Sequence, residues 1–245
     1  MFWRRRTKVT PPAIRDGLRV YAMGDIHGRL DLLDRNLAAV EADLHNHPVA
    51  EHLIIFLGDY VDRGPSSAGV IDRLITLRST HPTVCLKGNH EALMLEALAQ
   101  PSNVEAWAAV GGLNTAMSYG FTPPSPSSVQ AGAELSAGLA ERLPVAHRTF
   151  LTTLSLSFEL DDYFFVHAGV RPKVPLDAQR EEDLLWIRDE FLLHEAPFAR
   201  FIVHGHTPMR EPDIRPNRMN LDTGAFATSR LTCVALDGTD RRFIG

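Results

Sequence analysis

The chain has 245 residues, of which 44% are hydrophobic and 22% charged, a composition typical of a soluble globular protein with a substantial core. Its formal net charge of −5 argues against nucleic acid or an anionic membrane surface as a partner. No apolar run reaches the ~20 residues of a membrane span, and two cysteines are too few for a disulfide framework, so we expect a cytoplasmic protein.

The first residues, MFWRRRTK, are basic and lack the apolar stretch of a secretory signal. We expect residues 1–16 to form a flexible basic tail. Three segments then share one pattern, in which an apolar strand leads through a polar loop into a helix: LRVYAMGDIHGRLDLLDRNLAAVEADL, HLIIFLGDYVDRGPSSAGVIDRLITL and TVCLKGNHEALMLEALA. Alternating strands and helices predict βαβ crossovers and a parallel sheet.

A helical insertion is predicted over about residues 92–154. Its stretch FTPPSPSS, residues 121–128, is typical of an exposed loop. LSFEL and YFFVHAG then predict a hairpin, and RFIVHGHTP, RMNLDTGA and RLTCVALDG predict further strands. REEDLLWIRDEFLL, which precedes RFIVHGHTP, predicts one helix. We expect a single domain over residues 17–245, and the pattern alone indicates one doubly wound α/β sheet.

Residues that bind metals recur directly after the predicted strands. The groups are GDIHG at 24–28, GDYVDRG at 58–64, GNHE at 88–91, HAG at 167–169 and HGHT at 204–207. Because the carboxyl ends of neighbouring strands lie together in such a sheet, these groups can share one pocket. A single Asp after a strand is more often a helix cap than a ligand, but five groups in succession indicate a metal site. Carboxylates, imidazoles and an amide, without thiolates, suit Mn, Fe, Zn or Co better than Mg or Ca.

Three of these groups carry a resemblance to a known family. D-x-H-G, G-D-x-V-D-R-G and G-N-H-E resemble the signature of the PPP-type serine/threonine phosphatases, which belong to the calcineurin-like metallophosphoesterases. The chain looks most similar to their small bacterial and bacteriophage branch, typified by lambda phosphatase. The resemblance spans Arg19 to about Val234. It implies a four-layer α/β sandwich of two mixed β-sheets flanked by helices, in place of a single sheet.

The resemblance also implies two divalent metal ions, with Mn²⁺ as the first choice and Fe, Zn or Co as alternatives. In that family pattern the first metal is bound by Asp25 and His27, and Asp59 bridges the two metals. The implied ligands of the second metal are Asn89, His167 and His206. A water shared between two such ions has a pKa lowered towards ~7, which implies direct attack of hydroxide on phosphorus.

Other residues are implied to handle the phosphoryl group. Arg63 and Arg188 resemble the phosphate clamps, since a guanidinium matches phosphate oxygens bidentately; Asn89 and His90 also face the phosphate. Arg188 has the alternative of a solvent-facing position on an amphipathic helix. His90 resembles the general acid, with Asp62 as the carboxylate that orients it.

Further polar residues have structural interpretations. His204 is expected to support the ligand His206, with direct ligation as the alternative. Gly205-His206-Thr207-Pro208 lacks the second histidine that the broader superfamily often carries. Asp222 is predicted to be a turn residue beneath the site. Three histidines outside the motifs are predicted to lie on the surface: His45, His47 and His147.

The favoured function is hydrolysis of phosphoserine and phosphothreonine in a phosphorylated protein or peptide, with phosphotyrosine as a further candidate. A hydrolase of dinucleoside polyphosphates is the main alternative, because that family shares the metal signature. Its members commonly differ at the positions of Asp62 and Glu91, so both residues favour the protein phosphatase branch. A binding module that keeps the fold without chemistry is an alternative of another class.

Overall fold

The structure is a computed structural model that describes residues 11–122 and 131–245. It contains two five-stranded mixed sheets. The first has the strand order β10-β9-β1-β2-β3, with bounds Asp240–Ile244, Cys233–Asp237, Leu18–Met23, Glu51–Phe56 and Thr83–Cys85. The second has the order β4-β5-β6-β8-β7, with bounds Ser157–Leu160, Tyr163–Val166, Phe201–His204, Arg218–Asn220 and Asp213–Ile214.

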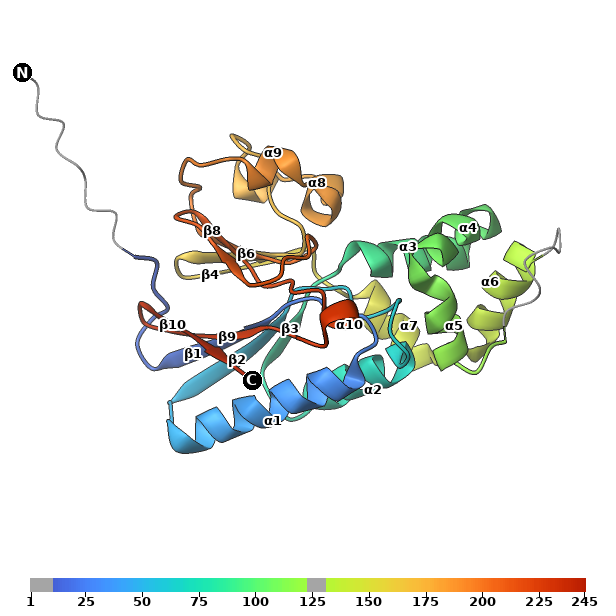
Figure 1. The fold of residues 1–245 in the computed structure, drawn as a ribbon, viewed down its shortest axis with the longest axis horizontal. Coiled ribbons are helices and arrows are strands. Elements are labelled where there is room, and N and C mark those ends of the chain that lie inside the picture. The colour runs from blue at the N-terminus through green and yellow to red at the C-terminus, as the bar shows by residue number, and fades with distance from the viewer. Residues whose placement is uncertain (1–10, 123–130) are drawn as a thin grey trace, which may run out of the picture.

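Helices cover both sheets and one end of the sandwich (Figure 1). The first sheet is covered by α1 and α2, Leu30–Asn46 and Ser67–Leu77, and the second by α8 and α9, Glu181–Trp186 and Asp189–Leu192. The remaining α-helices of 89–122 and 131–152 gather at one end: α3 Asn89–Ala99, α4 Val104–Trp107, α5 Leu113–Ser118, α6 Ala131–Arg142 and α7 Val145–Thr152. Short turns of helix are η1 Pro101–Asn103, η2 Ala108–Gly112, η3 Leu176–Ala178 and α10 Ala225–Thr228.

The apolar runs are explained by burial of both faces of the first sheet. On β1, Tyr21 and Met23 pack in the core beneath α1 and α2, whereas Val20 and Ala22 pack in the core between the two sheets. Successive side chains of a strand point to opposite faces, so a strand covered on both sides reads as continuously hydrophobic. The four-layer sandwich of two mixed sheets is therefore confirmed, and the expectation of a single doubly wound sheet is wrong.

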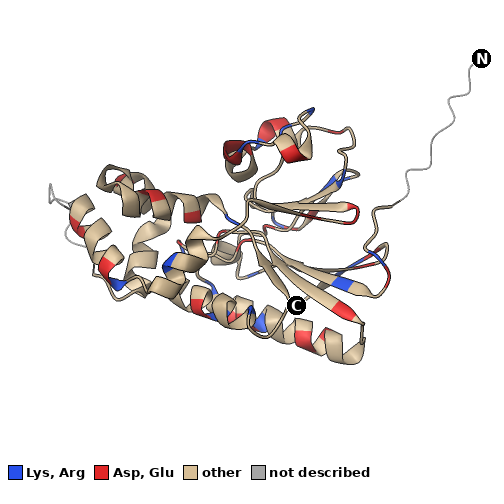
Figure 2. Ribbon diagram, turned by 180° about the vertical axis from the view of Figure 1, so that it is seen from behind, with Lys and Arg blue, Asp and Glu red and all other residues tan. Residues whose placement is uncertain are grey.

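The order of strands places the predicted motifs at one edge. β1, β2 and β3 are parallel neighbours, and β5 and β6 are parallel neighbours in the second sheet. The loops that follow these strands hold the five predicted groups, so their carboxyl ends meet between the sheets. Basic and acidic residues are interspersed over the layers in Figure 2, in keeping with the modest net charge. Within 11–122 and 131–245, no helix is long and apolar enough to cross a membrane.

The structure corrects two boundaries and leaves one untested. Ile14 falls in the predicted tail, yet its side chain is buried and its N–H donates to the carbonyl of Gly238 at 2.9 Å, so the packed chain begins earlier than residue 17. The predicted helix REEDLLWIRDEFLL is interrupted between Trp186 and Asp189. Most of the predicted loop at 121–128, from 123 onwards, and residues 1–10 lie outside the described residues.

Candidate active site

The loops after β1, β2 and β6 hold their polar residues in a strained backbone. Five site residues other than glycine have positive φ angles, which L-amino acids adopt at a cost of roughly 1–3 kcal/mol each. They are His27 (47°), Asp59 (54°), Asp62 (70°), Arg63 (67°) and His206 (65°). Such strain persists only where the surroundings fix the backbone, and it is concentrated here at a single place in the fold.

Glu91 is one of the groups that fix this backbone. Its carboxylate is fully buried and accepts N–H groups from Asp59 at 2.9 Å, Tyr60 at 2.7 Å, Val61 at 3.2 Å and Gly88 at 2.9 Å. The side chain thus shapes the loop after β2 from the first turn of α3. The motif G-N-H-E was predicted for its Asn and His, and this anchoring role of the glutamate was missed.

Glycine is required where the loops approach the acidic side chains. A Cβ at Gly88 would lie 2.1 Å from Oδ1 of Asp59, and a Cβ at Gly205 would lie 2.1 Å from Oδ1 of Asp25. Both distances are far below any van der Waals contact, so no other residue fits without moving the carboxylates. The two glycines let Asp25 and Asp59 sit against the backbone of neighbouring loops.

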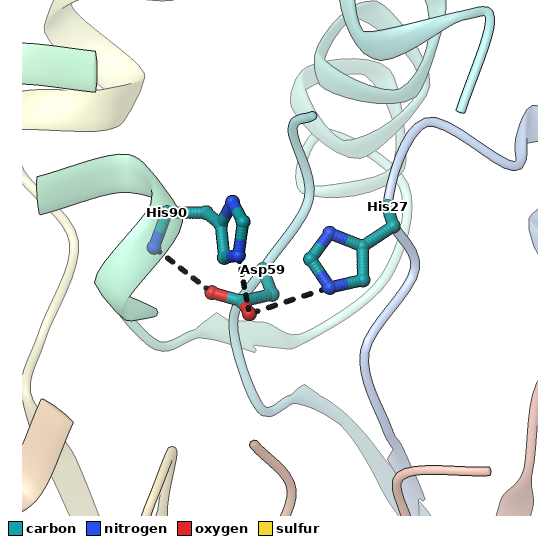
Figure 3. A group of neighbouring side chains, drawn as sticks. All are labelled: His27, Asp59 and His90. Carbon is teal, nitrogen blue, oxygen red and sulfur yellow. Dashed lines mark hydrogen bonds and ion pairs between the residues drawn. The ribbon is translucent and has the colours of Figure 1, made fainter. Parts of the chain in front are cut away.

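Asp59 lies at the centre of four histidines and an asparagine. Its Oδ2 is 3.5 Å from Nε2 of His27 and 3.9 Å from Nε2 of His90, and its Oδ1 is 3.4 Å from Nε2 of His167. Figure 3 shows the carboxylate of Asp59 between the rings of His27 and His90. Among 11–122 and 131–245, two sets of three ligand atoms lie within 4.8 Å of one another: His27, Asp59 and His90, and Asp59, His167 and His206. Asp59 belongs to both sets, as the bridging position requires.

The orientation of the imidazoles fits metal binding. His27 and His167 each donate Nδ1–H to a backbone carbonyl at 2.9 Å, that of Val61 and Leu57, respectively. Their Nε2 lone pairs must then point towards Asp59, and that of His167 also lies 2.9 Å from Oδ1 of Asn89. Lone pairs that face one another in a buried place are stabilised by a cation between them, and a backbone carbonyl on the far nitrogen is the usual support of a histidine ligand.

The protonation states agree with this arrangement. Burial lowers the pKa of His27 and of His206 to about 3, and it also lowers that of His167, so these rings are neutral at physiological pH. A carboxylate among neutral imidazoles is the donor set that divalent Mn, Fe, Zn or Co accepts.

Asp25 occupies a different position from the other predicted ligands. Its carboxylate accepts the backbone N–H of His206 at 3.1 Å and lies outside both sets of three ligand atoms. Burial raises its pKa well above the usual range, and the charges of Asp222 and Asp59 raise it further. Asp222 was predicted to be a turn residue, and its side chain accepts the N–H of Gly224 at 2.8 Å. Its charge also raises the pKa of Asp25. Asp25 therefore lies beside the two sets of ligand atoms, and its role as ligand stays a prediction.

Both predicted phosphate clamps reach the site. The guanidinium of Arg63 donates to Nε2 of His27 at 3.1 Å, and its other terminal nitrogen lies 3.0 Å from Nε2 of His90. Nε of Arg188 donates to Nε2 of His206 at 3.3 Å. Arg188 reaches it because the chain leaves the helical conformation there, with φ −131° and ψ −102°. The interruption between α8 and α9 thus brings the guanidinium to His206, while the residue remains exposed to solvent.

Comparison with known proteins decides the family. Residues 18–231 match the calcineurin-like phosphoesterases. The chain is a calcineurin-like phosphoesterase. It is 29% identical over 233 residues to the asymmetrical bis(5'-nucleosyl)-tetraphosphatase PrpE of Anoxybacillus flavithermus, covering 86% of this chain and 88% of the relative. It is 30% identical over 218 residues to serine/threonine-protein phosphatase 1 of Salmonella typhimurium, covering 87% and 89%.

Solved structures show the same fold for this calcineurin-like phosphoesterase. A candidate diadenosine tetraphosphatase has a TM-score of 0.65 at 22% identity, over 97% of this chain and 95% of the other. A cold-active protein-tyrosine phosphatase of a psychrophilic Shewanella has a TM-score of 0.57 at 13% identity, over 95% and 83%. At these identities the likeness establishes the fold alone.

The predicted acid pair of the phosphoesterase is assembled in the interior. Nδ1 of His90 lies 2.7 Å from Oδ2 of Asp62, and both side chains are buried. Burial lowers the pKa of His90, but the charge of Asp59 and the bond to Asp62 outweigh it, so the pKa lies above its ordinary value. Trp107 and Thr115 also bond to Asp62. Neither was predicted, because they lie in a helical stretch without a motif.

Two further buried histidines, His204 and His147, lie outside the two sets of ligand atoms. His204 has its nitrogens near the carbonyl of Gly205 at 3.1 Å and the guanidinium of Arg218 at 3.3 Å, so they face away from Asp59. The prediction of a surface position for His147 is wrong. That ring is buried, 2.9 Å from the hydroxyl of Tyr119 and 2.8 Å from Asp72, and it joins three helices. The other two predicted surface histidines are exposed.

Proposed function

We propose that this metal-dependent phosphoesterase is a phosphoprotein phosphatase that hydrolyses phosphoserine and phosphothreonine, with phosphotyrosine as a further candidate. The buried pair of His90 and Asp62 carries this proposal. An alkoxide that leaves from phosphoserine is a strong base, so its departure needs a proton donor. A phosphate group that leaves from a polyphosphate is a far weaker base and gains little from one.

The residues fit a pair of divalent ions, for which we propose Mn²⁺, with Fe, Zn or Co as alternatives. Asp59 would bridge them, Asp25 and His27 would complete one site, and the remaining three predicted ligands would complete the other: Asn89, His167 and His206. When bound, two such ions activate water for in-line attack and neutralise the phosphoryl oxygens.

The side chains of the protein supply binding, orientation and the proton. Arg63, in the loop after β2, and Arg188, between α8 and α9, would bind the phosphoryl oxygens by charge-assisted hydrogen bonds. His90 keeps Nδ1–H on Asp62, so that a proton on Nε2 faces the substrate, and its raised pKa favours the protonated form. The departing oxygen takes this proton, and the neutral imidazole remains.

A hydrolase of dinucleoside polyphosphates is the second candidate. It is supported by the similarity to the PrpE tetraphosphatase and to the candidate diadenosine tetraphosphatase. Asp62 and Glu91 weigh towards the phosphatase, because Asp62 orients the proton donor and Glu91 holds the loop that carries Asp62. The intact sets of ligand atoms weigh against a silent binding module.

Cys85 and Cys233 are buried and free, which supports a cytoplasmic location.

The decisive experiment compares kcat/KM of the Mn²⁺-loaded enzyme for phosphoserine and phosphothreonine peptides with that for diadenosine tetraphosphate. His90→Asn serves as the control for dependence on the proton donor. The proposal predicts a higher value for the peptides and a strong dependence on His90. A preference for the tetraphosphate that His90→Asn leaves intact would establish the second candidate instead.

A further inference from the structure

A short stretch of the helical insertion, Trp107–Thr115, contacts the two residues that follow Val61 in the loop after β2. This stretch leaves α4, passes through Ala108–Gly112, where the chain is kinked at Gly111, and enters α5. The contacts on Asp62 and on Arg63 are made by different members of the stretch.

Asp62 receives its hydrogen bonds from side chains. The indole Nε1–H of Trp107 lies 3.0 and 3.1 Å from the two carboxylate oxygens, and the hydroxyl of Thr115 donates to Oδ1 at 2.7 Å. The same hydroxyl oxygen accepts the backbone N–H of Asp62 at 2.8 Å, and Ser67 lies 2.9 Å from it. The Asp62 side chain has no exposed surface. The orientation of this carboxylate is therefore set by Trp107, Thr115 and His90 together.

Arg63 is held through its backbone. Its N–H donates to the carbonyl of Gly111 at 3.2 Å, and its carbonyl accepts from the side-chain amide of Asn114. Gly111 has φ +109°, and a Cβ there would lie 2.7 Å from the nitrogen of Arg63. The two non-glycine residues with the largest positive φ values in the loop after β2, Asp62 and Arg63, are thus supported by one segment of the insertion.

We propose that Trp107 and Thr115 are positioning residues for the proton donor. A buried carboxylate with a single donor can rotate about its Cβ–Cγ bond, and the imidazole bonded to it would turn as well. With two further donors, Asp62 has one orientation, and Nε2 of His90 stays directed at the phosphoryl group, as outer partners fix histidines elsewhere. The inference rests on the proposed function of His90 as proton donor. It makes the insertion part of the catalytic frame.

The experiment uses the full chain loaded with Mn²⁺ and two small esters, glycerol phosphate and p-nitrophenyl phosphate. Trp107→Phe removes the indole N–H, and Thr115→Val removes the hydroxyl at equal volume. Thr115→Ser is the conservative rescue. Ser136→Ala is the matched control, because Ser136 is also a buried hydroxyl of the insertion but bonds to the carbonyl of Ala97 at 2.9 Å, away from Asp62.

We expect Trp107→Phe and Thr115→Val each to lower kcat on glycerol phosphate about tenfold, a fraction of the ~10²–10⁴-fold of a complete general acid. KM should change little, and the loss on p-nitrophenyl phosphate should be clearly smaller, because nitrophenolate leaves without a proton. Thr115→Ser should recover most of the loss caused by Val, and Ser136→Ala should show no leaving-group dependence. Metal content and thermal midpoints are measured for every variant.

Asp62→Asn and the double variant Asp62→Asn/Trp107→Phe separate the possible results. If Trp107 acts through Asp62, the double variant is no slower than Asp62→Asn alone. Equal losses of Trp107→Phe and Thr115→Val on both esters, or additive losses in the double variant, would overturn the positioning role while His90 keeps its own. If Asp62→Asn itself shows no leaving-group dependence, the proton-donor assignment fails and the positioning role fails with it. Neither result depends on which physiological substrate the enzyme prefers.

Discussion

Replacement of His90 by asparagine removes a proton donor from the interior while leaving a polar side chain of similar reach. His90 is 1% exposed and sits 2.7 Å from Asp62 and 3.0 Å from a guanidinium nitrogen of Arg63. A donor held this firmly should act at about the middle of the usual range for a general acid, so we expect a loss near 10³-fold in kcat on a phosphoserine peptide. This corresponds to about 4 kcal/mol of transition-state stabilisation.

The assay measures kcat of His90→Asn on the phosphoserine peptide and on p-nitrophenyl phosphate. The loss on the nitrophenyl ester should be at least tenfold smaller, because nitrophenolate is stable as an anion and draws little on a general acid. Metal content must be measured in parallel, since His90 also belongs to the set of ligand atoms with His27 and Asp59. Equal losses on both substrates with the metals retained would refute the role of proton donor. Loss of one metal ion in the variant would identify His90 as a ligand instead.

Other predictions concern the phosphate clamp, the loop anchor and a distant ion network. Arg63→Ala should lower kcat/KM on both substrates by a similar factor, since each presents the same phosphoryl oxygens; a loss confined to one substrate would contradict this. Glu91→Gln should lower the free energy of unfolding in urea by about 3 kcal/mol, because an amide cannot accept four N–H groups; an unchanged midpoint would refute the anchoring role. Asp43 is buried and bonded to Arg19 and Arg242, and although burial opposes it, these partners lower its pKa to about 2. Its contribution is present above the unfolded pKa near ~3.9 and is lost as the pH falls towards 2, so Asp43→Asn should cost about 2 kcal/mol at pH 7 and flatten the acid limb of the stability curve; an equally steep limb would contradict it.

The sequence was most informative where residues act through local spacing. Asp59, His167 and His206 each lie within three residues after the end of a strand, so knowledge of the strands was enough to bring them together. The second sheet was not visible in the βα pattern, because its strands are short and come from the later part of the chain. For this part of the chain the second sheet was predicted from the family resemblance and not from the hydrophobic periodicity.

The residues that were missed act through tertiary contacts. Trp107 and Thr115 read as ordinary positions of a helix, and only the packing of the insertion against the loop after β2 brings them to Asp62. Arg188 lies in a stretch with a regular helical pattern, yet its contact with His206 coincides with a break in that helix. His147 carries no signal of burial either, since its partners lie 28 and 75 residues away.

The most direct test of a dinuclear centre around a bridging carboxylate is the metal content of the purified, Mn²⁺-reconstituted protein, compared with that of Asp59→Asn. Asp59 faces His27 on one side and His167 on the other, so one substitution should weaken both positions. The account predicts two ions per chain in the natural sequence and the loss of most of both in Asp59→Asn. A single ion per chain in the natural sequence, or an undiminished content in Asp59→Asn, would contradict it.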